Sequence, residues 1–73
     1  MIVMQIMKVL PAGAHFKILD EYKPVLEGSI AMADKSVMFK DINDDLKYQR
    51  IFGKFHVTLI DKDDNDIWII NIR

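Results

Sequence analysis

The sequence predicts an all-β fold, or a β fold with one short helix near residues 42–49, in the form of a small antiparallel barrel or a bent sheet. Five to seven strands are expected, the last two forming a C-terminal hairpin. Two observations lead to this expectation. The apolar segments are short and several alternate with the period of two that a strand requires. Only three glycines and two prolines punctuate the 73 residues, so no linker divides residues 1–73, which are expected to form a single compact domain.

Two strand pairs are expected in the first part of the chain. Residues 2–10 are apolar on both faces and predict a buried strand, which Pro11 and Gly13 end. Residues 15–19 predict the next strand and are its expected antiparallel partner. Residues 25–33 and 36–42 form the second expected pair, joined by a two-residue turn at Asp34 and Lys35.

The segment after them allows two interpretations. Residues 43–49 form either a short helix, capped by Asn43 or Asp41, or a turn that leads into a strand. Residues 51–61 alternate between two faces and predict a long half-buried strand with a bend at Gly53. Residues 67–72 are rich in β-branched and aromatic side chains, so they complete a hairpin around the polar loop 61–66.

Both ends of the chain carry strands that are apolar on two faces. A strand of that kind belongs in the centre of a core or at an interface. Homodimerisation is therefore expected, and the alternative is a closed barrel in which a helix over residues 43–49 covers one end.

Composition excludes several classes of protein. The chain has no cysteine, which excludes disulfides, cysteine zinc sites and thiol catalysis. Its net charge of −1 argues against coating of nucleic acid or adsorption to a membrane by charge. No apolar run approaches the roughly 18 residues that span a bilayer, and the first cation, Lys8, follows the N-terminal apolar run instead of preceding it. A cytoplasmic protein without a membrane partner is expected.

No motif predicts catalysis. His15 and His56 are the only histidines, and no Ser-His-Asp signature or glycine-rich oxyanion turn accompanies them. The loop at 61–66 matches the first ligand positions of a calcium-binding EF-hand, but Asp66 stands where glycine is required and Ile72 where glutamate is required. We therefore expect no enzyme, no metal and no cofactor, and the rival hypothesis is an enzyme that uses a histidine with an aspartate.

The uneven distribution of acids is the most informative polar feature. The aspartates of residues 41–73 fall in two clusters, at 41–45 and at 61–66. An acidic rim can steer the approach of a basic partner surface. The predicted partner-binding residues are those of the second cluster, namely Asp61, Asp63, Asp64 and Asp66. The simpler interpretation is a polar loop that only keeps the protein soluble.

A second candidate surface lies in residues 48–56, where aromatic and basic side chains alternate. Such a strand can stack and neutralise single-stranded nucleic acid or a nucleotide. The residues concerned are Tyr48, Arg50, Phe52, Lys54 and His56. The competing interpretation makes these the core aromatics of a central strand, because Phe55 shares a face with Val57 and Leu59.

Taken together, these features predict a small non-enzymatic binding protein that acts by protein–protein interaction, as an accessory or inhibitory factor of the kind found in phages and mobile elements. Nucleic-acid or nucleotide binding through residues 48–56 is the alternative.

Overall fold

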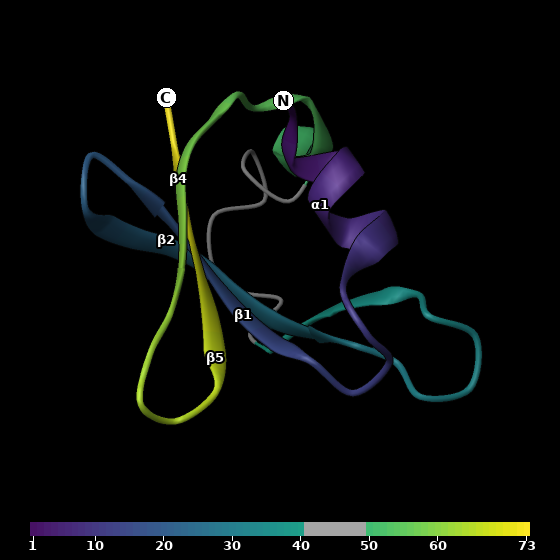
Figure 1. Cartoon of the computed structure of the whole chain (residues 1–73). Coiled ribbons are helices and arrows are strands. Elements are labelled where there is room, and N and C mark those ends of the chain that lie inside the picture. The colour runs from purple at the N-terminus through teal and green to yellow at the C-terminus, as the bar shows by residue number, and fades with distance from the viewer. Residues whose placement is uncertain (41–49) are drawn as a thin grey trace.

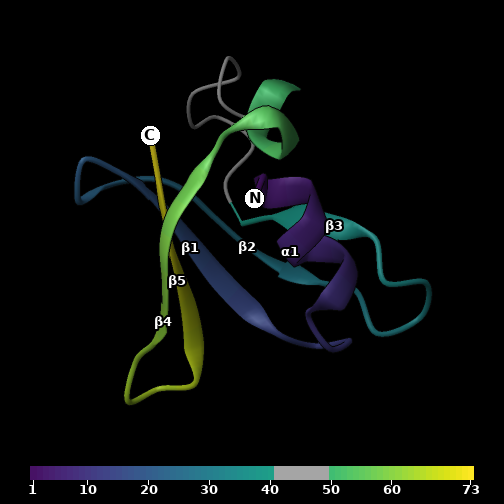
Figure 2. The same cartoon turned by 45° about the horizontal axis from the view of Figure 1, so that its top comes forward.

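The computed structural model of the chain describes residues 1–40 and 50–73. They form a bent five-stranded mixed sheet in the order β3-β2-β1-β5-β4, with one α-helix packed against it (Figures 1 and 2). The elements in chain order are α1 (Val3–Val9), β1 (His15–Asp20), β2 (Lys23–Ile30), β3 (Val37–Phe39), the 3-10 helix η1 (Phe52–Lys54), β4 (Val57–Lys62) and β5 (Ile67–Ile72). Of the two predicted forms, the bent sheet is confirmed, because the sheet does not close into a barrel.

The hydrophobic core lies between α1 and one face of the sheet. In β1, Phe16 and Ile18 are fully buried and point to this face, and in β5 Ile70 is equally buried beside Ile18. The helix side chains that meet them are Val3, Ile6, Met7 and, just after the helix, Leu10. Burying an aliphatic or aromatic side chain of this size stabilises a fold by about 1.5–3 kcal/mol, so this one layer of contacts holds helix and sheet together.

The prediction of a strand over residues 2–10 is wrong, because this segment is α1. Its buried residues, Val3, Ile6, Met7 and Leu10, follow the spacing i, i+3, i+4, i+7, which places them on one side of a helix. Gln5 and Lys8 fall on the exposed side. The Gln5 side-chain oxygen also accepts a hydrogen bond of 2.9 Å from the backbone N–H of Ile2, which satisfies a donor at the start of the helix.

The expected pairing of residues 2–10 with 15–19 is wrong for the same reason. Strand β1 pairs antiparallel with β2 and parallel with β5, so it lies near the middle of the sheet. The two-sided apolar character of residues 67–72 follows from the position of β5 between β1 and β4. Within one chain, the N-terminal apolar segment covers the core and the C-terminal one is an inner strand.

The remaining predicted strands are confirmed in part. Strands β2 and β3 pair antiparallel as expected, but β3 has three residues and residues 31–36 join the strands in place of a two-residue turn. The C-terminal hairpin of β4 and β5 is confirmed. Within the described residues no helix has the length and apolar character needed to cross a membrane. The alternatives proposed for residues 42–49 lie outside the described residues.

The long strand predicted over residues 51–61 is wrong in its first half. Residues 52–54 form η1, and β4 begins only at Val57. The Phe52 ring packs edge-on against Phe39, with centroids 5.1 Å apart and an interplanar angle of 86°. Gly53 is buried against Met4 of α1, where a Cβ atom would lie 2.8 Å from the Met4 methyl group. These core contacts turn the segment out of the sheet, because a continued strand would leave Phe52 without them.

Candidate functional site

Strand β4 forms one margin of the sheet and has a strand neighbour on only one side among the described strands. Its lower half and the loop to β5 project from the body of the molecule in both views (Figures 1 and 2). Leu59 is 53% exposed and Ile60 is 36% exposed, and they point to opposite faces of the sheet. Long apolar edge strands readily pair with a strand of another chain, so this margin is the candidate functional site.

The open part of this margin has a defined beginning. The N–H of Val57 donates a hydrogen bond of 2.9 Å to the carbonyl oxygen of Met1, and Ile2 forms a bridge with His56. Beyond that point residues 58–62 are all exposed. We call residues 58–62 the free edge. The opposite margin, β3, offers only three residues, since it spans Val37–Phe39.

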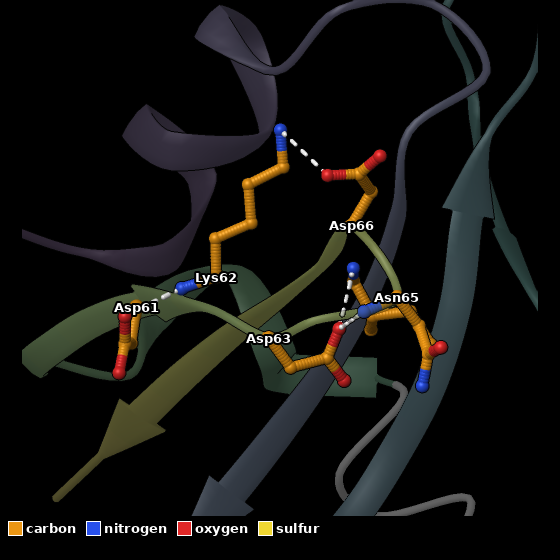
Figure 3. A network of polar contacts seen from close by, with 6 residues as sticks. Asp61, Lys62, Asp63, Asn65 and Asp66 are labelled. Atoms are coloured by element: carbon orange, nitrogen blue, oxygen red, sulfur yellow. Dashed lines mark hydrogen bonds and ion pairs between the residues drawn. The ribbon is translucent and has the colours of Figure 1, made fainter.

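Of the predicted acidic residues, Asp61 lies on the free edge, and Asp63, Asp64 and Asp66 lie in the loop that follows it. Figure 3 shows Asp61, Asp63 and Asp66. One Asp63 carboxylate oxygen accepts hydrogen bonds from the backbone N–H of Asn65, at 2.8 Å, and of Ile67, at 2.9 Å. The loop closes through Asp66, whose φ of 62° is left-handed. Asp63 therefore holds the turn, a role that the sequence analysis missed although aspartate commonly forms such turns.

The other three predicted aspartates make fewer contacts than Asp63. Asp61 accepts a hydrogen bond of 2.7 Å from the N–H of Lys62, and Asp66 lies 3.6 Å from the Lys62 ammonium group. That ammonium also lies 5.0 Å from the centre of the Trp68 ring. Exposed ion pairs of this kind contribute about 0–1 kcal/mol. Asp64 is exposed and makes no side-chain hydrogen bond or ion pair within residues 1–40 and 50–73, so the loop presents a net negative charge to solvent.

The other end of β4 is basic among the described residues. Lys54 and His56 precede the strand and are exposed. The N–H of Arg73 donates a hydrogen bond of 3.1 Å to the carbonyl oxygen of His56, which places this arginine beside it. The hairpin therefore runs from cationic side chains at one end to carboxylates at the other.

The residues predicted to bind nucleic acid do not share one strand. Phe52 lies in η1 and its ring is packed on Phe39, whereas Lys54 ends η1 and His56 precedes β4. Arg50 is exposed and precedes η1, and Tyr48 lies outside the described residues. The alternating stacking surface on which this prediction depended is not formed by the residues that the structure describes.

A separate hollow of about 580 Å³ lies on the sheet face away from α1. His15 and Ser29 are opposite one another on β1 and β2 and both line it, with Glu27 and Lys40 nearby. The Lys40 ammonium lies 3.7 Å from the Glu27 carboxylate. No hydrogen bond joins His15 to Ser29 or to a carboxylate in the described part of the chain, so these groups are not connected as a nucleophile, base and orienting acid would be.

The described residues contain no cluster of metal-binding side chains either. No group of three or more histidine, aspartate or glutamate side chains within residues 1–40 and 50–73 has the geometry to hold a metal ion.

Comparison of this chain with models of protein families, with curated proteins and with solved structures gives no significant match.

Proposed function

We propose that this chain is a non-enzymatic binding protein that acts by protein–protein contact along the free edge of β4. Carboxylates of Asp61 and of the acidic loop, residues 63–66, steer the partner toward this edge. The observation that carries the proposal is the exposure of Leu59 and Ile60 on a strand that, among the described strands, has a neighbour on one side only. Addition of a strand from another protein would satisfy the outward backbone groups of β4 and cover these side chains. A cytoplasmic location and an accessory or inhibitory role are parts of the same proposal.

The aspartates contribute to the rate and specificity of approach. Carboxylates at the rim of an interface speed the encounter with a basic surface and are screened by salt. The structure modifies the prediction in one respect, because Asp63 is occupied within its own loop. The steering residues are therefore Asp61, Asp64 and Asp66.

The proposal is tested by affinity capture from an extract of the cells that produce the protein. Tagged wild-type chain is compared with Leu59→Asp, which places a carboxylate on the free edge, and with Met32→Asp as a matched control. Met32 is 77% exposed and lies in the connection between β2 and β3, at the margin of the sheet opposite β4. Proteins that wild type and the Met32 variant retain, and that the Leu59 variant loses, are the expected result. Equal recovery by all three baits would contradict the proposal.

Nucleic-acid binding is not proposed, because no observation of the described residues favours it over the free edge. It stays a prediction that rests on the aromatic and basic side chains of residues 48–56.

A further inference from the structure

We infer that the protein occupying the free edge is a second copy of this chain, and that two β4 strands pair antiparallel about a two-fold axis at Ile60. This inference rests on the proposed function, since it names the occupant of the same edge. It is carried by three observations on the described residues, which concern the extent of the free edge, the register that it permits and the charges at its ends.

The extent of the free edge determines its centre. Contacts of Met1 and Ile2 with Val57 and His56 occupy the margin before residue 58, and the loop begins after Lys62. Five residues remain, and Ile60 is the middle one. The irregularity in the pairing of β4 with β5 falls between Val57 and Leu59, so the strand is regular from Leu59 onward.

Symmetry then restricts the register. Two antiparallel strands related by a two-fold axis pair residues that lie on the same face of the sheet, so the axis must pass beside one residue and its own copy. Centring on Asp61 would place two aspartates directly opposite one another, which is unfavourable. Centring on Leu59 would use Thr58, where the strand is irregular. Centring on Ile60 pairs Ile60 with Ile60, Leu59 with Asp61, and Thr58 with Lys62.

Charge complementarity supports the same arrangement. Antiparallel pairing brings the acidic loop of one copy, with Asp64 and Asp66, to the end of β4 where the other copy carries Lys54, His56 and Arg73. The contact is made twice because of the symmetry. A parallel arrangement would place the two acidic loops side by side, and their like charges would repel each other.

The pairing also satisfies the outward backbone groups of β4 and covers Ile60. Ile60 of each copy becomes covered by its counterpart on the helix side of the sheet, and the two sheets join into one continuous sheet. Self-pairing would therefore protect the free edge from pairing with strands of other proteins.

The register is tested by cysteine cross-linking, for which the absence of native cysteine makes the chain suitable. Ile60→Cys is compared with Leu59→Cys under mild oxidation, each variant first shown to fold by circular dichroism. In the inferred register the Cα atoms of the two residues 60 lie about 4.5–5.5 Å apart, within reach of a disulfide, whereas the two residues 59 lie beyond the roughly 7 Å limit. Leu59 is the more exposed of the two, so random collision would favour the control.

The expected result is a disulfide-linked dimer that forms at least several times faster with Ile60→Cys than with Leu59→Cys. Light scattering of the wild-type protein should give twice the mass of the chain, and Ile60→Lys should give the mass of one chain. Equal or faster linking through residue 59 would overturn the register. A single-chain mass for the wild type at every concentration, or an unchanged dimer in Ile60→Lys, would overturn the inference.

Failure of this inference is distinguishable from failure of the proposed function. If the wild-type chain is a monomer but the Leu59→Asp variant still loses a captured protein, the free edge binds a foreign strand and only the identity of the occupant is wrong. Leu59→Asp also places a second carboxylate opposite Asp61 in the inferred register, so it disrupts self-pairing as well. If the Leu59→Asp variant loses nothing, the proposed function itself fails.

Discussion

Asp63 and Asp64 are neighbours of the same type, and the structure gives them different tasks. Asp63 accepts two backbone hydrogen bonds across the loop, while the carboxylate of Asp64 stays in solvent. Charge counting along the sequence treats them as equivalent, because the direction of a side chain within a loop depends on the local backbone. The acidic loop thus combines a structural residue with residues available to a partner.

This difference predicts unequal effects on stability. Asp63→Ala should lower the free energy of unfolding by about 1–3 kcal/mol, since it leaves two backbone donors without their acceptor. Asp64→Ala should change it by no more than about 0.5 kcal/mol, as is usual for an exposed residue without partners. Urea denaturation followed by Trp68 fluorescence measures both. Equal losses in the two variants would show that Asp63 does not hold the loop.

Because of Asp34, the connection between β2 and β3 is expected to contribute to the free energy of unfolding in a pH-dependent way. The backbone N–H of Ser36 donates to its carboxylate at 3.0 Å and, with the Ser36 side chain, lowers the pKa of Asp34 below its ordinary value of 3.8. A pKa that is lower in the folded state stabilises the fold above the ordinary pKa, and this contribution is lost as the pH falls through the lowered value.

The expected outcome is a small difference in unfolding free energy between wild type and Asp34→Ala that is present at neutral pH and disappears in strong acid. Denaturation curves recorded at a series of pH values below 5 test it. A difference that stays constant through the acid range would mean that the ionised carboxylate makes no contribution.

At the scale of elements, α1 shows why the N-terminal segment was misassigned. Residues 2–10 contain apolar side chains at nearly every position, so alternation with period two and the spacing i, i+3, i+4, i+7 are both present. The polar residues Gln5 and Lys8, three apart, were the signal for a helix, since they fall on its exposed side. Short apolar runs are ambiguous between strand and helix, and the face that is buried decides.

The helix predicts a clear contrast between two of its aliphatic residues. Ile6 is 5% exposed within the core, and Val9 is 75% exposed on the other side of the helix. Ile6→Ala should cost about 2–4 kcal/mol of unfolding free energy, because it removes buried methyl groups and leaves a cavity. Val9→Ala should change stability by less than about 0.5 kcal/mol. The strand expected from the sequence, buried on both faces, would bury Ile6 and Val9 alike, so a large loss at Val9 would contradict the helix.

Met7 distinguishes the helix from a strand with one buried face, because it is adjacent to Ile6. A helix buries both, and here Met7 is 3% exposed, whereas a half-buried strand would bury only one of them. Thermal denaturation should therefore give large losses for both Ile6→Ala and Met7→Ala. A loss for only one of the pair would favour a strand.

At the scale of the whole molecule, the strand order creates the candidate site. Strands β1 and β5 are far apart in sequence and pair parallel in the centre of the sheet, which leaves β4 at the margin. The sequence predicts the hairpin of β4 and β5 but does not predict which of these two strands pairs with β1. Which of the two strands is exposed is a property of the long-range pairing.

The charge separation along β4 predicts a specific effect on association. Asp64→Asn together with Asp66→Asn should weaken self-association and slow its rate, and should reduce the dependence of both on ionic strength, while the melting temperature of the monomer changes little. Asp63 is kept so that the loop remains folded. Sedimentation and stopped-flow mixing at several salt concentrations give these values. Association that is insensitive to salt already in the wild type would assign the loop a solubilising role alone.

Local chemistry sufficed for the parts of this protein that depend on residues near one another. Period-two segments and the polar loop predict β1, β2 and the C-terminal hairpin, and the absence of cysteine excludes thiol chemistry. The tertiary structure alone decided that residues 2–10 coil into a helix, that Phe52 leaves the sheet for the core, and that β4 becomes the margin. These outcomes depend on contacts between distant segments. The identity of an apolar side chain does not indicate which distant surface will cover it.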